Sequence, residues 1–406
     1  MPQYRYRART STGEAITGVM EAGSIRELET ILSRRRIFLI EAKEEKKGWL
    51  SQELKLPFAR GVKLPQLILF TRQLAALLRA GVPITQALLT LSEQTDNPSL
   101  KSAILQVRED IEKGSSLGNA LQRQSHIFSE LYTSTVRVGE EAGNLEEVLN
   151  RVGDFLEREM DVKGKVKGAL LYPVVLLVVA TGLIVFLVTY VLPKFRAVFY
   201  AANVPLPLPT YLLFRLSEIF QRYWYWGLIF IFFLLVGIRI VYNSEKGRYM
   251  VDRWKLKFPL FGPLLRKVGI SRFARSLETL VRSGVDLARS FQVIKGSIGN
   301  TVLGEVMEKI RANVMRGGSI SEPLRQSREF PPMVAQMISI GEETGNMEDM
   351  LREISESYEK EVDFTIKMLT SILEPLLLVI MGGVVLFIAL SLYLPLFKMA
   401  KIIKSY

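Results

Sequence analysis

The chain of 406 residues carries a formal net charge of +12, with 49% hydrophobic and 23% charged residues. It has no cysteine, which excludes disulfides, thiolate metal sites and cysteine nucleophiles, and its single histidine, His126, excludes a metal site built from several histidines. So much apolar sequence beside so much charge indicates apolar blocks that alternate with charged ones. In a membrane protein, positive flanks and attraction to anionic lipids explain the charge, so we expect membrane lipids and no nucleic acid as partners.

The amino-terminal residues 1–47 predict a small α/β module. Two alternating stretches around a Ser-Thr-Gly turn indicate a β-hairpin, residues 25–35 have helical periodicity, and residues 37–40 form an apolar, strand-like run. The expected order is therefore ββαβ. The first residues are charged and lack an apolar run, so we expect no cleavable signal peptide and a cytoplasmic N-terminus. A charged, irregular linker is expected at residues 48–66.

The rest of the sequence repeats itself. VGEEAGNL at 138–145 returns as IGEETGNM at 340–347, and FTRQLAALLRAGV at 70–82 returns as FARSLETLVRSGV at 273–285. The offset also aligns LPKF with LPLF at the ends of two apolar runs. Self-similarity on this scale indicates that the architecture doubles one unit.

Each copy begins with helical periodicity. Phe70, Leu74 and Leu77 fall on one face of a helix that Gly81 would end in a left-handed conformation, and Gly284 stands at the equivalent position of the second copy. We therefore expect an all-α membrane protein with two repeated cytoplasmic helical bundles. The bundles are expected at residues 67–168 and 243–371.

Three apolar runs are long enough to cross a bilayer of ~30 Å. The expected transmembrane helices are residues 169–192, 223–242 and 372–397. Trp224 and Trp226 at one end of the second helix and Arg239 near the other are typical of membrane-interface anchors. A loop at residues 193–222, which contains PLPLP, and a short tail at 398–406 are expected in the periplasm.

Flanking charges predict the orientation. Lys and Arg are dense before the first crossing and after the second but sparse in the loop, which favours cytoplasmic bundles. The tail lysines Lys398, Lys401 and Lys404 run against this rule. In each copy we expect one long helix to leave the bundle and enter the membrane, kinked at Pro173 or Pro375.

No motif for catalysis or cofactor binding was found. The sequence lacks a nucleotide phosphate loop, a nucleophile elbow, a zinc-binding helix motif and a calcium loop. We therefore expect no enzyme activity, no catalytic residues, no cofactor and no metal.

The repeated Glu-Glu-x-Gly-Asn motif is the main candidate site. Gly143 would end one helix, Asn144 would cap the next, and Glu147 occupies the capping-box position. Capping does not explain the two consecutive glutamates. A solvated acidic corner, a docking surface for a basic partner and a cation site at a symmetric interface all remain open. The candidate residues are Glu140, Glu141, Asn144, Glu342, Glu343 and Asn346.

Glu374 is a second candidate, directly before Pro375 at the edge of the third crossing. A carboxylate inside a membrane is costly, which favours a functional contact. An interfacial position reached at little cost is the alternative.

These motifs, taken in order, resemble the inner-membrane platform proteins of type II secretion and type IV pilus assembly, the general secretion F / pilus assembly C family. The resemblance covers nearly the whole chain. It is carried by YRYRARTSTGEAITG, FTRQLAALLRAGVPITQAL, GEEAGNLEEVL, YPVVLLVVATG, VLPKF, PLPLPT, GEETGN, EPLLL and LPLF.

The resemblance implies a multi-pass protein of the bacterial inner membrane that couples a cytoplasmic assembly or retraction ATPase to the polymerisation of pilin or pseudopilin subunits. Inner-membrane alignment and accessory proteins would be further partners. The doubled glutamates would contact the ATPase, and Glu374 would contact pilin. The internal pseudo-twofold symmetry makes a homo-oligomer an expectation. The alternative is a membrane-tethered scaffold or transporter subunit unrelated to pili, and secretion, twitching and DNA uptake stay open.

Overall fold

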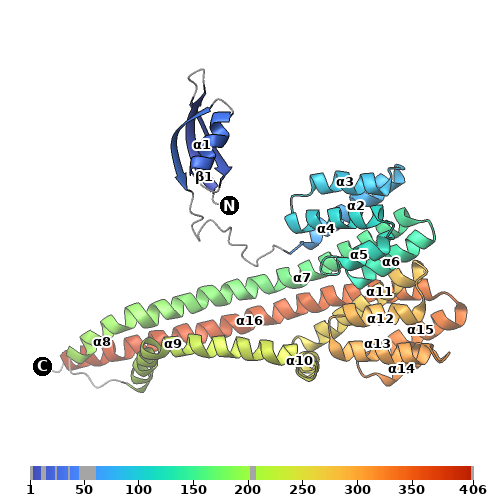
Figure 1. The fold of residues 1–406 in the computed structure, drawn as a ribbon. Coiled ribbons are helices and arrows are strands. Elements are labelled where there is room, and N and C mark those ends of the chain that lie inside the picture. The colour runs from blue at the N-terminus through green and yellow to red at the C-terminus, as the bar shows by residue number, and fades with distance from the viewer. Residues whose placement is uncertain are drawn as a thin grey trace. The chain divides into compact units, whose positions relative to one another are not determined.

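The computed structural model describes residues 3–10, 15–22, 25–34, 37–44, 61–201 and 207–403. The chain divides into two compact units, Met1–Gly61 and Val62–Tyr406 (Figure 1). Each unit has its own hydrophobic core.

The first unit is a three-stranded antiparallel sheet with one helix. Its elements are β1 (Gln3–Thr10), β2 (Ala15–Glu21), α1 (Ile25–Arg34) and β3 (Ile37–Glu44). β1 lies in the centre, between β2 and β3, and its register with β3 shifts between Arg7 and Ala8. Leu28 and Leu32 of α1 are buried in a small core with Tyr4 of β1.

Every regular element among the described residues of the second unit is a helix or a helical turn. Its elements are α2 (Leu64–Arg79), α3 (Ile84–Gln94), α4 (Pro98–Glu112), α5 (Leu117–Arg123), α6 (Glu130–Glu141), α7 (Leu145–Phe186), the π-helical turn η1 (Leu187–Val191), α8 (Leu192–Ala201), α9 (Leu208–Asn243), α10 (Glu245–Lys257), α11 (Gly262–Arg282), α12 (Leu287–Ser297), α13 (Thr301–Val314), α14 (Ser321–Gln326), α15 (Pro332–Thr344) and α16 (Met347–Ile403). Figure 1 shows α2 to α6 and α11 to α15 gathered at one end of α7 and α16, and α8 at the other end.

Local chemistry sets the ends of the short helices. The side chains of Asn97, Ser116 and Ser129 cap α4, α5 and α6 by accepting backbone N–H groups of the first turn. After α2 and α11, Gly81 (φ +79°) and Gly284 (φ +80°) adopt the left-handed conformation. The prediction of left-handed glycines at these helix ends is confirmed.

The two copies of the repeat share one hydrophobic core. Leu74 and Leu149 from the first copy and Leu277 and Leu351 from the second are fully buried in the same cluster. The repeat is visible inside this core, because Phe70 packs against Phe128 at a ring-centroid distance of 5.9 Å and the equivalent Phe273 packs against Phe330 at 5.3 Å. The copies therefore fold as one body.

Two long helices leave this body. α7 starts at Leu145 and runs into η1 and α8 without a break, and α16 has 57 residues, about 85 Å at 1.5 Å per residue. The prediction of a long helix leaving the bundle in each copy is confirmed. Within the described residues, three helical stretches are long and apolar enough to span a membrane, namely Leu145–Phe195, Leu208–Asn243 and Met347–Pro395.

The prediction of a loop at residues 193–222 was wrong over most of that interval. α8 continues to Ala201 and α9 begins at Leu208, so helix occupies most of it. The proline-rich segment PLPLP was interpreted as part of a loop, although it includes the start of a helix. Pro209 lies in the first turn of α9, where its missing N–H has no helical partner to lose. The predicted tail at 398–406 is also helical as far as Ile403, while residues 202–206 lie outside the described part of the chain.

Candidate functional site

The first glutamate of each repeated motif caps a helix within its own copy. The Glu140 carboxylate accepts the backbone N–H groups of Leu117 (2.7 Å) and Gly118 (2.9 Å) at the start of α5. Glu342 accepts those of the equivalent Ile320 (2.5 Å) and Ser321 (3.2 Å) at the start of α14. A carboxylate stabilises the partial positive charge and the unpaired N–H groups of a helix N-terminus. Sequence reasoning missed this role because the partners lie more than 20 residues away.

The other members of the motif face outward. Glu141, Asn144, Glu343 and Asn346 are all exposed. Glu343 accepts a hydrogen bond from the Ser339 hydroxyl at 3.1 Å. The structure thus leaves one glutamate and one asparagine of each copy accessible on the same corner between two helices.

The predicted capping box is wrong in its side-chain contacts. Gly143 (φ +73°) and Gly345 (φ +70°) make the expected left-handed turns. Asn144 stands at the N-cap of α7, but its side chain makes no capping hydrogen bond, and Glu147 bonds Arg151 at 2.5 Å instead. Among the described residues, no group of three or more Asp, Glu or His side chains is arranged to hold a metal ion.

An arginine–glutamate pair recurs at equivalent positions of the two copies. In the first, Arg72 of α2 donates two parallel hydrogen bonds of 2.9 Å to Glu157 of α7, and this contact lowers the pKa of the Glu157 carboxyl. In the second, Arg275 of α11 donates to Glu359 of α16 at 2.7 Å. Each pair therefore fixes the first helix of a copy to its long helix. The sequence held the signal, since the repeat offset aligns both arginines and both glutamates.

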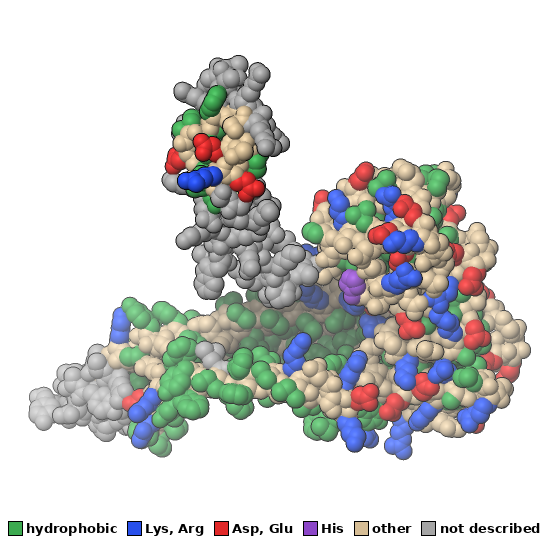
Figure 2. Space-filling view, viewed as in Figure 1, with side chains coloured by type: hydrophobic (Ala, Val, Ile, Leu, Met, Phe, Trp, Pro, Cys, Tyr) green, Lys and Arg blue, Asp and Glu red, His purple; other side chains and the backbone are tan. Residues whose placement is uncertain are grey.

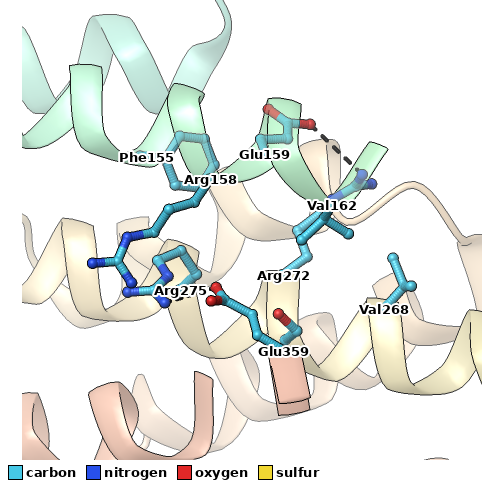
Figure 3. Close-up of a pocket in the computed structure, with 9 residues that line it drawn as sticks. Phe155, Arg158, Glu159, Val162, Val268, Arg272, Arg275 and Glu359 are labelled. Atoms are coloured by element: carbon cyan, nitrogen blue, oxygen red, sulfur yellow. Dashed lines mark hydrogen bonds and ion pairs between the residues drawn. The ribbon is translucent and has the colours of Figure 1, made fainter. Parts of the chain in front are cut away.

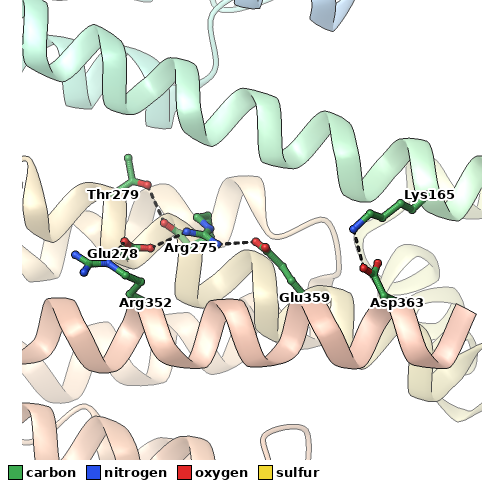
Figure 4. A network of polar contacts seen from close by, with 7 residues as sticks. All are labelled: Lys165, Arg275, Glu278, Thr279, Arg352, Glu359 and Asp363. Carbon is green, nitrogen blue, oxygen red and sulfur yellow. Dashed lines mark hydrogen bonds and ion pairs between the residues drawn. The ribbon is translucent and has the colours of Figure 1, made fainter.

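The second pair belongs to a larger buried network. Arg275 is only 7% exposed and also donates to Glu278 at 3.1 Å, which in turn accepts from Arg352 at 3.4 Å (Figure 4). Burying such charges is tolerated only where they are paired. The network therefore ties α11 firmly to α16.

Polar contacts also join the two copies to each other. Arg151 of α7 donates to the Arg282 carbonyl at the end of α11, and Arg272 of α11 approaches Glu159 of α7 at 3.6 Å. Beside them α7, α11 and α16 enclose a small pocket (Figure 3), where Figure 3 places Arg158 and Arg275 near one another. The contacts of Arg151 and Arg272 thereby hold α7 of the first copy against α11 of the second.

The membrane-related candidates lie on the long helices. Trp224 and Trp226 are exposed in the middle of α9, and Arg239 is exposed near its end. Glu374 is exposed on α16, within the span Met347–Pro395. Figure 2 shows hydrophobic side chains gathered along α9, whereas charged side chains spread over the bundle.

Hydrogen bonds also connect the apolar helices. Ser217 of α9 donates to the carbonyl of Val188 at 2.8 Å, within the π-helical turn, and Thr210 of α9 donates to the carbonyl of Ser391 in α16 at 2.6 Å. A π-helical turn frees a carbonyl from the regular ladder. Its pairing with a hydroxyl satisfies that group where water is scarce.

Family models match most of the chain and leave residues 44–69, 194–272 and 396–406 unmatched. The model described as type II secretion system (T2SS), protein F matches twice, at residues 70–193 and 273–395, and the model for the N-terminal domain of type II secretion system protein F matches residues 1–43. The two matches of one model fall on the two copies of the repeat.

Several curated relatives align over nearly their full length. A type IV pilus assembly protein PilC of Thermus thermophilus is 38% identical over 400 residues, covering 98% of both chains. PilC of Myxococcus xanthus is 35% identical over 398 residues, covering 98% of this chain and 95% of the relative. A type II secretion system protein F of Vibrio cholerae is 30% identical over 403 residues, again 98% of both.

Proposed function

Because the chain belongs to the type II secretion system protein F family, we propose that it is an inner-membrane platform protein of a type IV pilus or type II secretion machine. The carrying observation is the similarity to PilC and protein F relatives over 98% of the chain, with one family domain matched twice. Its proposed role is to couple a cytoplasmic assembly or retraction ATPase to the polymerisation of pilin or pseudopilin, without catalysis of its own.

In this proposal the helical body formed by the two copies lies in the cytoplasm as a pair of repeated bundles, together with the N-terminal module. Three spans cross the inner membrane, and the short connection between α8 and α9 faces the periplasm. The dense Lys and Arg residues before the first span and after the second support this orientation.

The architecture supports a mechanical role. A force on the helical body would reach the membrane along α7 and α16, because each continues from the shared core into an apolar span. The Arg72–Glu157 and Arg275–Glu359 pairs sit at the points where these helices leave the body. A displacement of the helical body would therefore be transmitted to the membrane spans with little deformation of the helices between them.

We place the contact with the ATPase at the exposed half of the repeated motif, Glu141 and Glu343 with Asn144 and Asn346. Glu140 and Glu342 would support that surface without contacting the partner, because their carboxylates accept hydrogen bonds from the N-termini of α5 and α14. Glu374 remains the proposed contact for pilin, because it is exposed on an apolar helix.

A co-purification experiment tests these assignments. The full chain, extracted in detergent, would be captured with the host's assembly ATPase and pilin, beside the variant Glu141→Lys/Glu343→Lys. A matched control, Glu93→Lys/Glu305→Lys, makes the same charge change at exposed positions elsewhere on the body. We expect wild type and control to retain both partners and the test variant to lose the ATPase alone.

Other outcomes separate the hypotheses. Retention of the ATPase by the test variant would contradict the docking surface while leaving the platform role intact. Capture of neither partner by wild type would favour a membrane-tethered scaffold, and solute flux through reconstituted liposomes would favour a transporter subunit.

A further inference from the structure

Helix α10 carries an apolar stripe on its outer side. Met250 and Trp254 of α10 and Phe258, the residue directly after α10, follow one another at intervals of four residues, and 57%, 71% and 51% of their surfaces are exposed. Together with Ile238 of α9 and with Phe261 and Leu265, they line a groove whose surface is almost wholly apolar. We call Met250, Trp254 and Phe258 the α10 stripe. Exposed apolar residues on this scale mark a surface that something covers.

Basic residues border the α10 stripe on both edges. At 3.6 residues per turn, Arg253 and Lys257 fall along one edge, and Arg248 and Lys255 fall along the other. An apolar face bordered by Lys and Arg is typical of helices that lie in the plane of a membrane interface. The charges then meet anionic lipid headgroups while the apolar face reaches the acyl chains.

The opposite face of α10 is fixed to the helical body, which sets the direction of the α10 stripe. Asp252 is fully buried, and its carboxylate accepts the backbone N–H and the hydroxyl of Thr301, both at 3.0 Å, at the start of α13. Leu256, one turn further, is buried beside it. The only acidic group in the middle of α10 thus points away from the apolar stripe.

The junction with α9 places α10 directly after a span. α9 ends at Asn243, Ser244 adopts an extended conformation (φ −85°, ψ 136°), and α10 begins at Glu245. The ring of Tyr242 lies below Arg248 (5.6 Å) and Lys255 (4.7 Å), so cation–π contacts hold this elbow. A helix tied to the end of a membrane span by a one-residue turn lies at the depth of the headgroups.

We propose that α10 is an in-plane membrane anchor whose occupant is the leaflet at the end of α9, with Trp254 and Met250 inserted and Arg248, Arg253 and Lys257 contacting anionic headgroups, while Lys255 is paired with Asp252. The continuity with the apolar span and the two basic edges favour lipid over a protein partner. An acidic protein surface would match the charges but not the apolar stripe between them. The inference depends on α9 spanning the membrane and not on the identity of the machine.

The chain has no cysteine, which permits a direct test by site-directed spin labelling. Met250→Cys and Trp254→Cys would each be labelled in the full chain, reconstituted in vesicles of phosphatidylcholine and phosphatidylglycerol. Ile231→Cys, exposed on α9, serves as the in-membrane reference, and Arg316→Cys, exposed on the body, serves as the aqueous reference. Collision rates with oxygen, which concentrates in lipid, and with a water-soluble nickel complex give the depth of each label.

We expect labels at 250 and 254 to collide more with oxygen than with nickel, at depths between the two references. Replacing phosphatidylglycerol by phosphatidylcholine should shift both labels toward water, and Arg253→Gln/Lys257→Gln should remove that shift, whereas Lys309→Gln/Arg316→Gln should not. Nickel-dominated collisions at both positions would overturn the anchor. Protection from both reagents would also overturn it, because it would show a protein cover such as a second copy. If the depths of the labels do not depend on phosphatidylglycerol, the headgroup contacts are refuted.

Discussion

Lys165 of α7 and Asp363 of α16 form an ion pair of 2.7 Å between the long helices of the two copies (Figure 4). Both side chains are well exposed, so the pair adds little to stability, about 0–1 kcal/mol. Its value is geometric, because it marks where α7 and α16 run side by side beyond the shared core.

That proximity predicts a cross-link. In the naturally cysteine-free chain, Lys165→Cys/Asp363→Cys should be joined within one molecule by a short bis-maleimide, seen as faster gel migration. Lys165→Cys/Glu353→Cys is the matched control, since ten helical residues displace the second thiol by about 15 Å along α16. Equal cross-linking of the two variants would contradict the packing of α7 on α16.

The two equivalent arginines should differ in their contribution to stability. Arg275→Ala leaves the buried Glu278 and the partly buried Glu359 without their main partner, and breaking such a buried pair costs about 3–5 kcal/mol. Arg72→Ala should cost less, because Arg72, Asp154 and Glu157 are all partly exposed to solvent. Thermal unfolding of the full chain in detergent measures both. Equal losses would show that burial does not distinguish the two sites.

The capping residues Glu140 and Glu342 should contribute to the free energy of unfolding, whereas the neighbouring Glu141 and Glu343 should contribute little. Glu140→Ala and Glu342→Ala each remove a helix cap and should each cost about 0.5–2 kcal/mol. Glu141→Ala and Glu343→Ala are exposed and should stay within about 0.5 kcal/mol of wild type. Melting temperatures of the four variants test this contrast. A large loss of stability in Glu141→Ala would contradict the exposed position of Glu141.

Asp252 should make stability depend on pH. Burial alone would raise the pKa of Asp252, but the hydrogen bonds from Thr301 and Lys255 outweigh it and leave the pKa below its ordinary value. The stabilisation is therefore complete above the unfolded pKa of about 4 and is lost as the pH falls through the lower folded pKa.

The measurement compares Asp252→Asn with wild type across this range. The variant should be less stable than wild type at neutral pH, and the difference should shrink as the pH falls below about 4. A difference that does not change with pH would show that the ionised carboxylate is not what stabilises the α10–α13 contact.

The glycines of the repeated motif should tolerate alanine unequally. A Cβ at Gly139 would lie 2.7 Å from Cγ2 of Val148 on α7, whereas a Cβ at the equivalent Gly341 would lie 3.2 Å from Cα of Met347. Gly139→Ala should cost about 1–3 kcal/mol through overpacking, and Gly341→Ala less. Melting temperatures again decide, and a reversed order would show that α7 yields more easily than the start of α16.

Much of this fold could be predicted from sequence because its signals are local. The apolar spacing from Phe70 onward, the glycines after α2 and α11, and the uncharged runs all lie within a few residues of the structure that they determine. The doubled motif also located the corners where α7 and α16 begin. The positions of Pro193 and Pro209 misled the prediction, since a proline in a first turn and a proline in a loop look alike in sequence.

The candidate site could be predicted only in part, because its contacts are remote. Nothing near Glu140 shows that its carboxylate serves the start of α5. The neighbours of Arg275 in the chain do not show that it faces Glu359, and only the comparison of the two copies aligns this pair with Arg72 and Glu157. The sequence also does not show that the two copies bury one core between them. That fact emerges only when Leu74 and Leu277 are seen in the same cluster.

Because the two copies share one core, the first copy cannot complete its packing before the second copy has been translated. The apolar side chains that complete it, from Ile270 onward, are translated only after the first copy and the helices α7 to α10 have been made. During that interval the nascent first copy stands with part of its apolar surface uncovered. Insertion of the first two spans fixes it beside the membrane, at the place where the second copy will emerge. Delivery to the membrane while translation continues would thus protect the half-finished body from aggregation.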